Sequence, residues 1–155
     1  MLDCDTERGQ HYMKNEDEVA LKVCEAMKCE QRKFGGKDTH LDRIFFRKED
    51  CVAVAEIKSR EMSIEELKGY GSYLISYDKV NTGRALSGLI GVPFLLYVKL
   101  IKDNTIVYWK VTDNNGNYIV NFNTKKTETK NNCNGGKALR ENSYIQLEDM
   151  KVLSI

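Results

Sequence analysis

Two short segments with strand periodicity, separated by only three residues, constrain the fold more than any other part of this sequence. Residues 41–47 and 51–58 are rich in β-branched and aromatic side chains, which favour strands. The intervening Lys48-Glu49-Asp50 has a suitable length for a turn between antiparallel strands. The sequence therefore predicts a β-hairpin over residues 41–58.

Helical patterns flank this hairpin on both sides. Before it, an apolar stripe at helical spacing predicts a helix over residues 15–30, with Asn15 as its N-cap. After it, Ser63 and Glu66 have the spacing of a capping box, which marks the start of a second helix. Apolar positions at helical spacing continue that second helix as far as Tyr77.

The rest of the chain completes an α/β pattern. Strand patterns recur at residues 93–101, 105–111 and 118–122. Residues 1–14 are expected to form an arm and residues 124–142 a loop, because both are polar and without periodicity. A chain of 155 residues fits a single domain. The order of elements predicts an α/β fold with a central mixed β-sheet flanked by helices.

Cysteine spacing and apolar content argue against a zinc-binding protein and a membrane-spanning protein, whereas the net charge neither requires nor excludes a nucleic-acid partner. The formal net charge is +1, so a nucleic-acid surface would have to come from local clustering of basic residues. The five cysteines are irregularly spaced and form no zinc-binding pattern, which favours a reducing, cytoplasmic compartment. The longest apolar run, around residues 91–100, contains Pro93 and is too short to cross a membrane.

The end of the second hairpin strand carries the candidate chemistry. Alternate residues of a strand share a face, so Val52, Val54, Glu56 and Lys58 are expected to point one way. Asp42, near the start of the partner strand, is expected to lie opposite that end. Paired carboxylates bind a hard cation such as Mg²⁺, and a nearby lysine can stabilise developing negative charge. The competing interpretation is a solvent-exposed salt bridge at a strand end, which contributes little stability.

These residues resemble a known catalytic motif. Asp42, a hairpin-length gap and Ala55-Glu56-Ile57-Lys58 are similar to the PD-(D/E)XK motif of restriction-endonuclease-like nucleases, although His40-Leu41 stands where the motif name has proline. The resemblance extends over residues 16–100, including a helix on each side of the motif. It implies a nuclease that cleaves phosphodiester bonds in DNA, less often RNA, with Mg²⁺ or Mn²⁺. The compact chain, without a recognisable sequence-reading module, suggests a small phage- or mobile-element-type member. Such nucleases often act as a homodimer, but the sequence shows no convincing interface.

The resemblance also implies a role for each residue of the motif. Asp42 and Glu56 would bind the metal together with the backbone carbonyl of Ile57, and Lys58 would position the attacking water. A further acid is expected on the first helix, where Glu16 shares the apolar face and Glu18 is the alternative on the opposite face. The other interpretation of Glu16 is a favourable charge at the helix N-terminus.

Basic residues outside the motif are candidates for phosphate contacts. Lys79 follows the second predicted helix, and a basic cluster lies in the predicted loop. The competing interpretation is that these side chains are simply solvated. The candidates are Lys79, Lys125, Lys126, Lys130, Lys137 and Arg140.

Two other classes of function compete with a nuclease. One is a non-catalytic nucleic-acid- or protein-binding domain that retains the nuclease fold, against which the complete Asp42, Glu56 and Lys58 set argues. The other is a different metal-dependent reaction, against which the lack of histidine clusters, glycine-rich phosphate loops and a serine elbow argues. The DNA structure that would be cut does not follow from the sequence.

Overall fold

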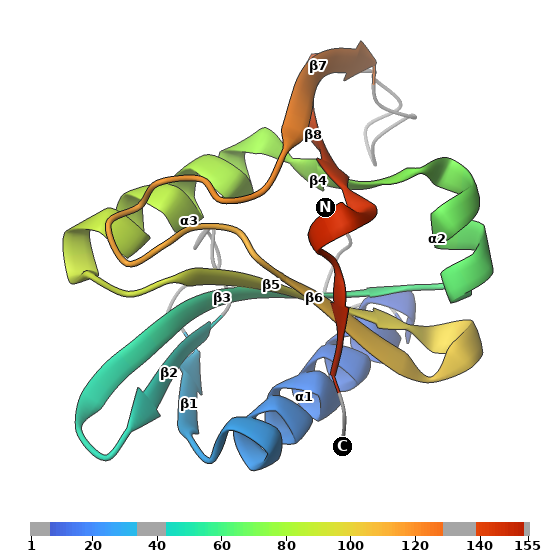
Figure 1. Ribbon diagram of the computed structural model, residues 1–155. Coiled ribbons are helices and arrows are strands. Elements are labelled where there is room, and N and C mark those ends of the chain that lie inside the picture. Colours follow the sequence, from blue (N-terminus) through green and yellow to red (C-terminus); the bar gives the residue numbers. More distant parts are fainter. Residues whose placement is uncertain (1–6, 34–42, 129–138, 154–155) are drawn as a thin grey trace.

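A computed structural model describes residues 7–33, 43–128 and 139–153 of the chain. Its main feature is a six-stranded mixed sheet in the order β1-β2-β3-β5-β6-β9 (Figure 1). The strands of this sheet are β1 (Glu30–Lys33), β2 (Arg43–Arg47), β3 (Asp50–Arg60), β5 (Phe94–Leu100), β6 (Thr105–Lys110) and β9 (Lys151–Val152). The pair β3–β5 is parallel and the other neighbours are antiparallel. An α/β fold with a central mixed sheet, as the sequence predicts, is confirmed.

A smaller sheet and three helices complete the described structure. The second sheet has the order β4-β8-β7, with β4 (Ser72–Ser76), β8 (Leu139–Gln146) and β7 (Phe122–Glu128). The α-helices are α1 (Glu7–Met27), α2 (Ile64–Tyr70) and α3 (Tyr77–Ile90), and single 3₁₀ turns lie at Ile101–Asp103 and Leu147–Asp149. In the described part of the chain, no helix is both long enough and apolar enough to cross a membrane.

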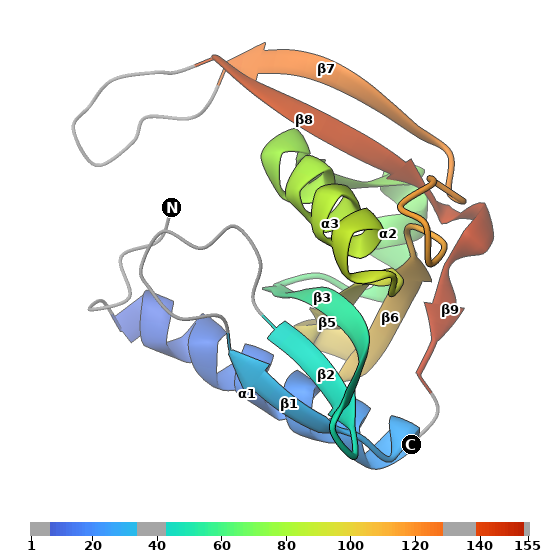
Figure 2. The ribbon, with the colours of Figure 1, turned by 90° about the vertical axis from the view of Figure 1, so that its left-hand side faces the viewer.

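The large sheet is covered on both faces. Figure 2 shows α1 beneath one face and α3 above the other, with β7 and β8 arching over α3 on the side away from the sheet. Val19 and Val23 of α1 pack in one buried cluster with Ala55 of β3. On the opposite face, Val80 of α3 packs in a second cluster with Leu96. Strand β3 is thus buried on both faces, as is typical of parallel strands in an α/β fold.

The predicted hairpin is present, with one irregularity. Phe45 pairs with Ala53 but Phe46 pairs with Cys51, so the register shifts by a residue at Val52. From Ala53 onward the predicted alternation is correct, whereas Val52 packs against the cluster on the α1 face. The prediction that Val52 shares a face with Glu56 is therefore wrong, because a one-residue bulge inverts the side chains before it.

The first helix begins eight residues earlier than predicted. Residues 7–14, expected to be an arm, form the first two turns of α1. Asn15 is therefore not an N-cap but a buried residue inside the helix, where its amide donates to the His11 carbonyl (2.9 Å). The helix ends at Met27, and Glu30 belongs to β1, a strand that the sequence did not predict.

The region after Ser63 also differs from the prediction. The Ser63 hydroxyl accepts a hydrogen bond from the Glu66 amide (3.1 Å), which confirms the helix start. Helix α2 ends at Tyr70, however, because Gly71 adopts a left-handed conformation (φ 78°) and closes the helix. Tyr73 and Tyr77, predicted on that helix, instead belong to β4 and to the first turn of α3.

The C-terminal prediction is wrong in part. Within the strand predicted at residues 118–122, Tyr118 forms an isolated bridge with Thr112. Only Phe122 belongs to a strand, as the first residue of β7. Much of the predicted loop at residues 124–142 is the β7–β8 ribbon, in which Lys125 pairs with Asn142. Residues 129–138 lie outside the described residues.

Candidate active site

Strand β3 places one carboxylate inside the protein. Glu56 pairs with Leu96 of the parallel neighbour β5 and has no exposed surface. Because side chains alternate along a strand, Glu56 lies on the face of Val54, which belongs to the buried cluster beneath α3. A fully buried carboxylate needs charge compensation, since desolvation of an isolated charge is very costly.

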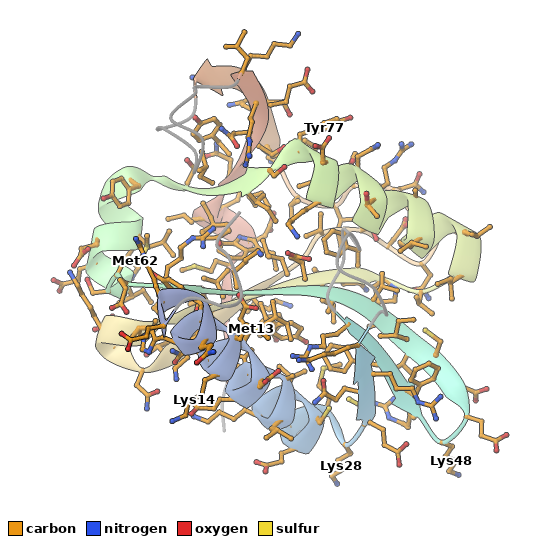
Figure 3. The ribbon with its side chains drawn as sticks, turned by 180° about the vertical axis from the view of Figure 1, so that it is seen from behind. Met13, Lys14, Lys28, Lys48, Met62 and Tyr77 are labelled. Carbon is orange, nitrogen blue, oxygen red and sulfur yellow. The ribbon has the colours of Figure 1, made fainter. Side chains whose placement is uncertain are left out.

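Two lysines from different elements compensate Glu56. The Nζ atom of Lys58 lies 3.1 Å from Oε1 of Glu56, and the Nζ atom of Lys79 lies 2.8 Å from the same oxygen. About a fifth to a quarter of each lysine side chain is exposed, 22% for Lys58 and 24% for Lys79. The ammonium groups therefore line the route from solvent to the buried carboxylate. Lys79 lies two residues after Tyr77, which Figure 3 labels at the start of α3.

A buried tyrosine lies in the electrostatic field of this centre. Burial raises the pKa of Tyr73, the positive charges of Arg60 and Lys58 lower it, and the negative charges of Glu56 and Glu16 raise it further. The Tyr73 hydroxyl has no hydrogen-bond partner among the described residues. Glu56 from β3 and Glu16 from α1 therefore act on the same hydroxyl group.

The three consecutive acids of α1 interact with different residues. Glu18 accepts a hydrogen bond from Nζ of Lys99 (3.0 Å), which lowers the pKa of Glu18. Asp17 accepts one from the buried Arg43 (2.5 Å). Glu16 is half-buried and contributes to the field at Tyr73. Glu18, the alternative to Glu16, is thus engaged by Lys99.

The other sequence candidates are dispersed. Lys125 and Lys126 lie on β7 and Arg140 on β8, all exposed. Nζ of Lys125 lies 5.7 Å from the centre of the Tyr144 ring, and Nζ of Lys126 lies 3.9 Å from the Glu141 carboxylate. Asp42, Lys130 and Lys137 lie outside the described residues. The pairing of Lys79 with Glu56 was not anticipated from the sequence, because the start of α3 was not recognised.

The described part of the centre offers one carboxylate that could be a ligand for a hard divalent cation. Among the described residues, no group of three His, Cys, Asp or Glu side chains could hold a metal ion. Glu56 nevertheless offers a buried oxygen donor of the type that Mg²⁺ and Mn²⁺ prefer. Both ammonium groups lie at Oε1 of Glu56, so a cation bound there would have to displace at least one of them or be held by further ligands.

The mixed sheet, the covering helices and the acid-lysine pair on β3 define a restriction-endonuclease-like α/β domain. The model of one protein family, described as phage putative PDDEXK endonuclease, matches residues 7–152. The chain belongs to this family. Comparison with curated protein sequences and with solved structures gave no significant match.

Proposed function

We propose that the protein is a divalent-metal-dependent endonuclease that hydrolyses phosphodiester bonds in DNA. The observation that carries this proposal is the buried Glu56 carboxylate held between Lys58 and Lys79 on the central strand of the family's fold. A buried acid with two partly exposed ammonium groups around it suits a centre that must bind a cation and a phosphate in turn.

Asp42 is the proposed second carboxylate of this centre. Arg43 pairs with Ala55, and its side chain reaches Asp17 on the α1 face of the sheet. Asp42 directly precedes Arg43 in the sequence, and its proposed role rests on its place in the motif with Glu56 and Lys58.

Each side chain has a role in the proposed reaction. Asp42, Glu56 and the Ile57 carbonyl would hold Mg²⁺ or Mn²⁺, with Glu16 acting through a water molecule. The cation would supply Lewis-acid activation of the phosphate and of a water molecule. Lys58 orients the attacking water and stabilises negative charge in the transition state, and Lys79 contacts the scissile phosphate.

The β7–β8 ribbon is the proposed site of more distant phosphate contacts. Lys125, Lys126 and Arg140 are exposed on this ribbon. Lys130 and Lys137 belong to the segment that joins its two strands. Phosphate contacts of this kind give affinity without sequence preference.

A cleavage assay tests the proposed function. Supercoiled, linear and branched DNAs are incubated with the wild type, Lys58→Ala and Asp42→Asn, in Mg²⁺, Mn²⁺ or EDTA. Loss of one electrostatic stabiliser in Lys58→Ala should slow cleavage by about two to three decades. Asp42→Asn and EDTA should abolish cleavage, and Lys110→Ala, an exposed lysine at the end of β6, should leave it unchanged.

The same assay has two outcomes that contradict the proposal. Equal cleavage by the wild type and both site variants would show that the activity does not come from this centre. Binding of DNA without cleavage of any substrate would instead favour a non-catalytic domain that retains the nuclease fold.

A further inference from the structure

A pocket of about 410 Å³ lies at the end of β3, the strand that carries Glu56 and Lys58. It lies where the end of β3, helix α2, β4 and β8 meet, beside Met62, which Figure 3 labels near α2. Tyr70, Tyr73, Leu74 and Tyr144 form much of its wall, and Arg60 adds a positive charge. This volume lies within the range of pockets that hold small organic groups.

The pocket presents apolar surface that the described residues leave uncovered. Tyr70 is 72% exposed and Leu74 is 45% exposed. Large apolar side chains gathered around a pocket mark a binding site more often than isolated ones do. The exposed Tyr70 and Leu74 side chains at the pocket therefore favour a ligand with a flat or apolar surface.

Positive charges lie against two of the aromatic rings. The guanidinium carbon of Arg60 lies 5.7 Å from the centre of the Tyr73 ring, and Nζ of Lys125 lies 5.7 Å from the centre of the Tyr144 ring. Aromatic faces combined with arginine and lysine are the usual means of holding single-stranded nucleic acid, in which bases stack on rings and phosphates contact cations. This charge favours a polyanion over an uncharged apolar ligand.

The pocket and the proposed catalytic centre share one face of β3. Glu56, Lys58 and Arg60 alternate along β3, so they share one face, and Arg60 lies about 13 Å along the strand from Glu56. Tyr73 interacts with both regions. The residue lines the pocket, and the charges of Glu56 and Lys58 shift the pKa of its hydroxyl group. A DNA strand that follows this face of β3 from Glu56 to Arg60 would therefore reach the pocket.

We propose that this pocket holds an unstacked base of the DNA strand that is cut. Tyr70 and Tyr144 stack on the base, and Arg60 contacts a neighbouring phosphate. The substrate class is then DNA with unpaired bases close to the scissile phosphate, such as a single strand, a flap or a junction, in preference to a fully paired duplex. This inference deepens the proposed nuclease function and rests on it for the identity of the strand.

A binding experiment without metal tests the pocket separately from cleavage. An oligonucleotide that carries the fluorescent base 2-aminopurine is titrated with protein in EDTA, as a single strand and as a blunt duplex. We expect the fluorescence of the single strand to be quenched on binding, since the base stacks on tyrosine. Tyr70→Ala should weaken single-strand binding by about 5- to 150-fold, the range for loss of one stacking contact.

Matched variants separate stacking from general effects on the fold. Tyr70→Phe keeps the ring and should bind the single strand as the wild type does. Leu89→Ala removes an exposed apolar side chain of α3 that does not line the pocket, and it should also bind normally. Thermal unfolding shows whether each variant is folded. The Tyr70 variants are expected to fold, because this side chain is mostly exposed.

The outcomes distinguish the two proposals. Unchanged single-strand affinity in Tyr70→Ala and Tyr144→Ala, with no quenching by the wild type, would overturn the pocket proposal even if the wild type cleaves DNA. Quenching that depends on Tyr70 would support the pocket even if the wild type cleaves nothing. In that last case the proposed catalytic activity alone would be wrong.

Discussion

Glu56 is fully buried, and two ammonium groups from separate elements approach the same carboxylate oxygen. Lys58 lies two residues further along β3, so its position follows from the strand alone. The position of the Lys79 side chain depends on how α3 packs over the sheet. Glu56 therefore makes one ion pair within β3, with Lys58, and one between β3 and α3, with Lys79. Mutation of each lysine separates the two contributions.

The first prediction concerns the coupling between these lysines. In EDTA, Lys58→Met and Lys79→Met should each lower the free energy of unfolding by about 1.5–3 kcal/mol, because each removes a charge-assisted contact while the other lysine still compensates Glu56. The double variant should lose more than the sum, by about 0.5–3 kcal/mol, because it leaves a buried charge without its two partners. Urea denaturation of the four proteins measures this coupling.

Glu56→Gln provides the control for that cycle. Added to the double variant, it should recover stability, since a neutral amide has no charge to compensate. Strictly additive losses, with no recovery on adding Glu56→Gln, would show that the two lysines do not compensate the same buried charge.

Elements that a local sequence pattern determines could be predicted. The β2–β3 hairpin, the start of α2 at Ser63 and the β5–β6 pair follow from periodicity, turn length and capping. These features place Glu56 and Lys58 on one face of a strand, and that is the part of the candidate site that can be predicted from sequence.

Elements that depend on packing were not predictable in the same way. The sequence of α3 contains two glycines and several residues with low helix propensity, so its helix is stabilised by burial of Val80, Gly83 and Ser87. Gly83 is needed for this contact, because an added Cβ would lie 1.9 Å from the Phe94 ring. Strands β7 and β8 are likewise polar, and only their pairing shows that they are strands. The pairing of Lys79 with Glu56 was missed for this reason.

The second prediction concerns the attachment of α1 to the sheet. Burial raises the pKa of Asp17, but hydrogen bonds from Arg43 and Lys33 outweigh it and hold the pKa below its ordinary value of 3.8. The folded protein therefore gains stability from the Asp17 carboxylate above about pH 4. That stability is lost as the pH falls through the depressed pKa.

Asp17→Asn tests this dependence. At neutral pH the variant should be less stable than the wild type by on the order of 1 kcal/mol, since the carboxylate is half-exposed. The difference should shrink as the pH falls below 4, as measured by urea denaturation across pH 2–7. Glu25→Gln, an exposed acid of the same helix, should show no such difference. A constant deficit for Asp17→Asn at all pH values would contradict the ion-pair explanation.

The third prediction concerns the β7–β8 ribbon as a DNA-binding element. Lys125→Gln with Lys126→Gln removes two exposed charges from β7. If both contact phosphates, the slope of log affinity against log salt should become shallower by about 2 for duplex DNA. Fluorescence anisotropy at several salt concentrations measures the slope.

A second pair of lysines provides the matched control. Lys28 and Lys48 lie at the end of the molecule away from β7 and β8, as Figure 3 shows. Lys28→Gln with Lys48→Gln changes the net charge equally and should leave the slope unchanged. Equal effects of the two double variants would indicate a response to net charge and would exclude a specific role for the ribbon.

At the scale of the whole molecule, the proposed catalytic centre joins separate parts of the chain. Glu56 is on the central strand, Lys79 is on the crossover that connects the parallel strands β3 and β5, and Glu16 is on the helix under the opposite face. Ligand binding to a site that exists only in the folded state stabilises the whole fold. The metal should therefore be detectable through global stability, without any assay of cleavage.

The last prediction is that Mg²⁺ stabilises the wild type against thermal unfolding. At a concentration 100 times its dissociation constant, the ion should add about 2.7 kcal/mol, which corresponds to a rise of roughly 5–11 °C for a protein of this size. EDTA should reverse the shift. Glu56→Gln and Asp42→Asn should show little or none, because each removes a proposed carboxylate ligand, whereas Lys58→Ala should retain it because it removes no oxygen ligand. A Mg²⁺ shift that is equal in the wild type and in Glu56→Gln would place the ion elsewhere and contradict the proposed centre.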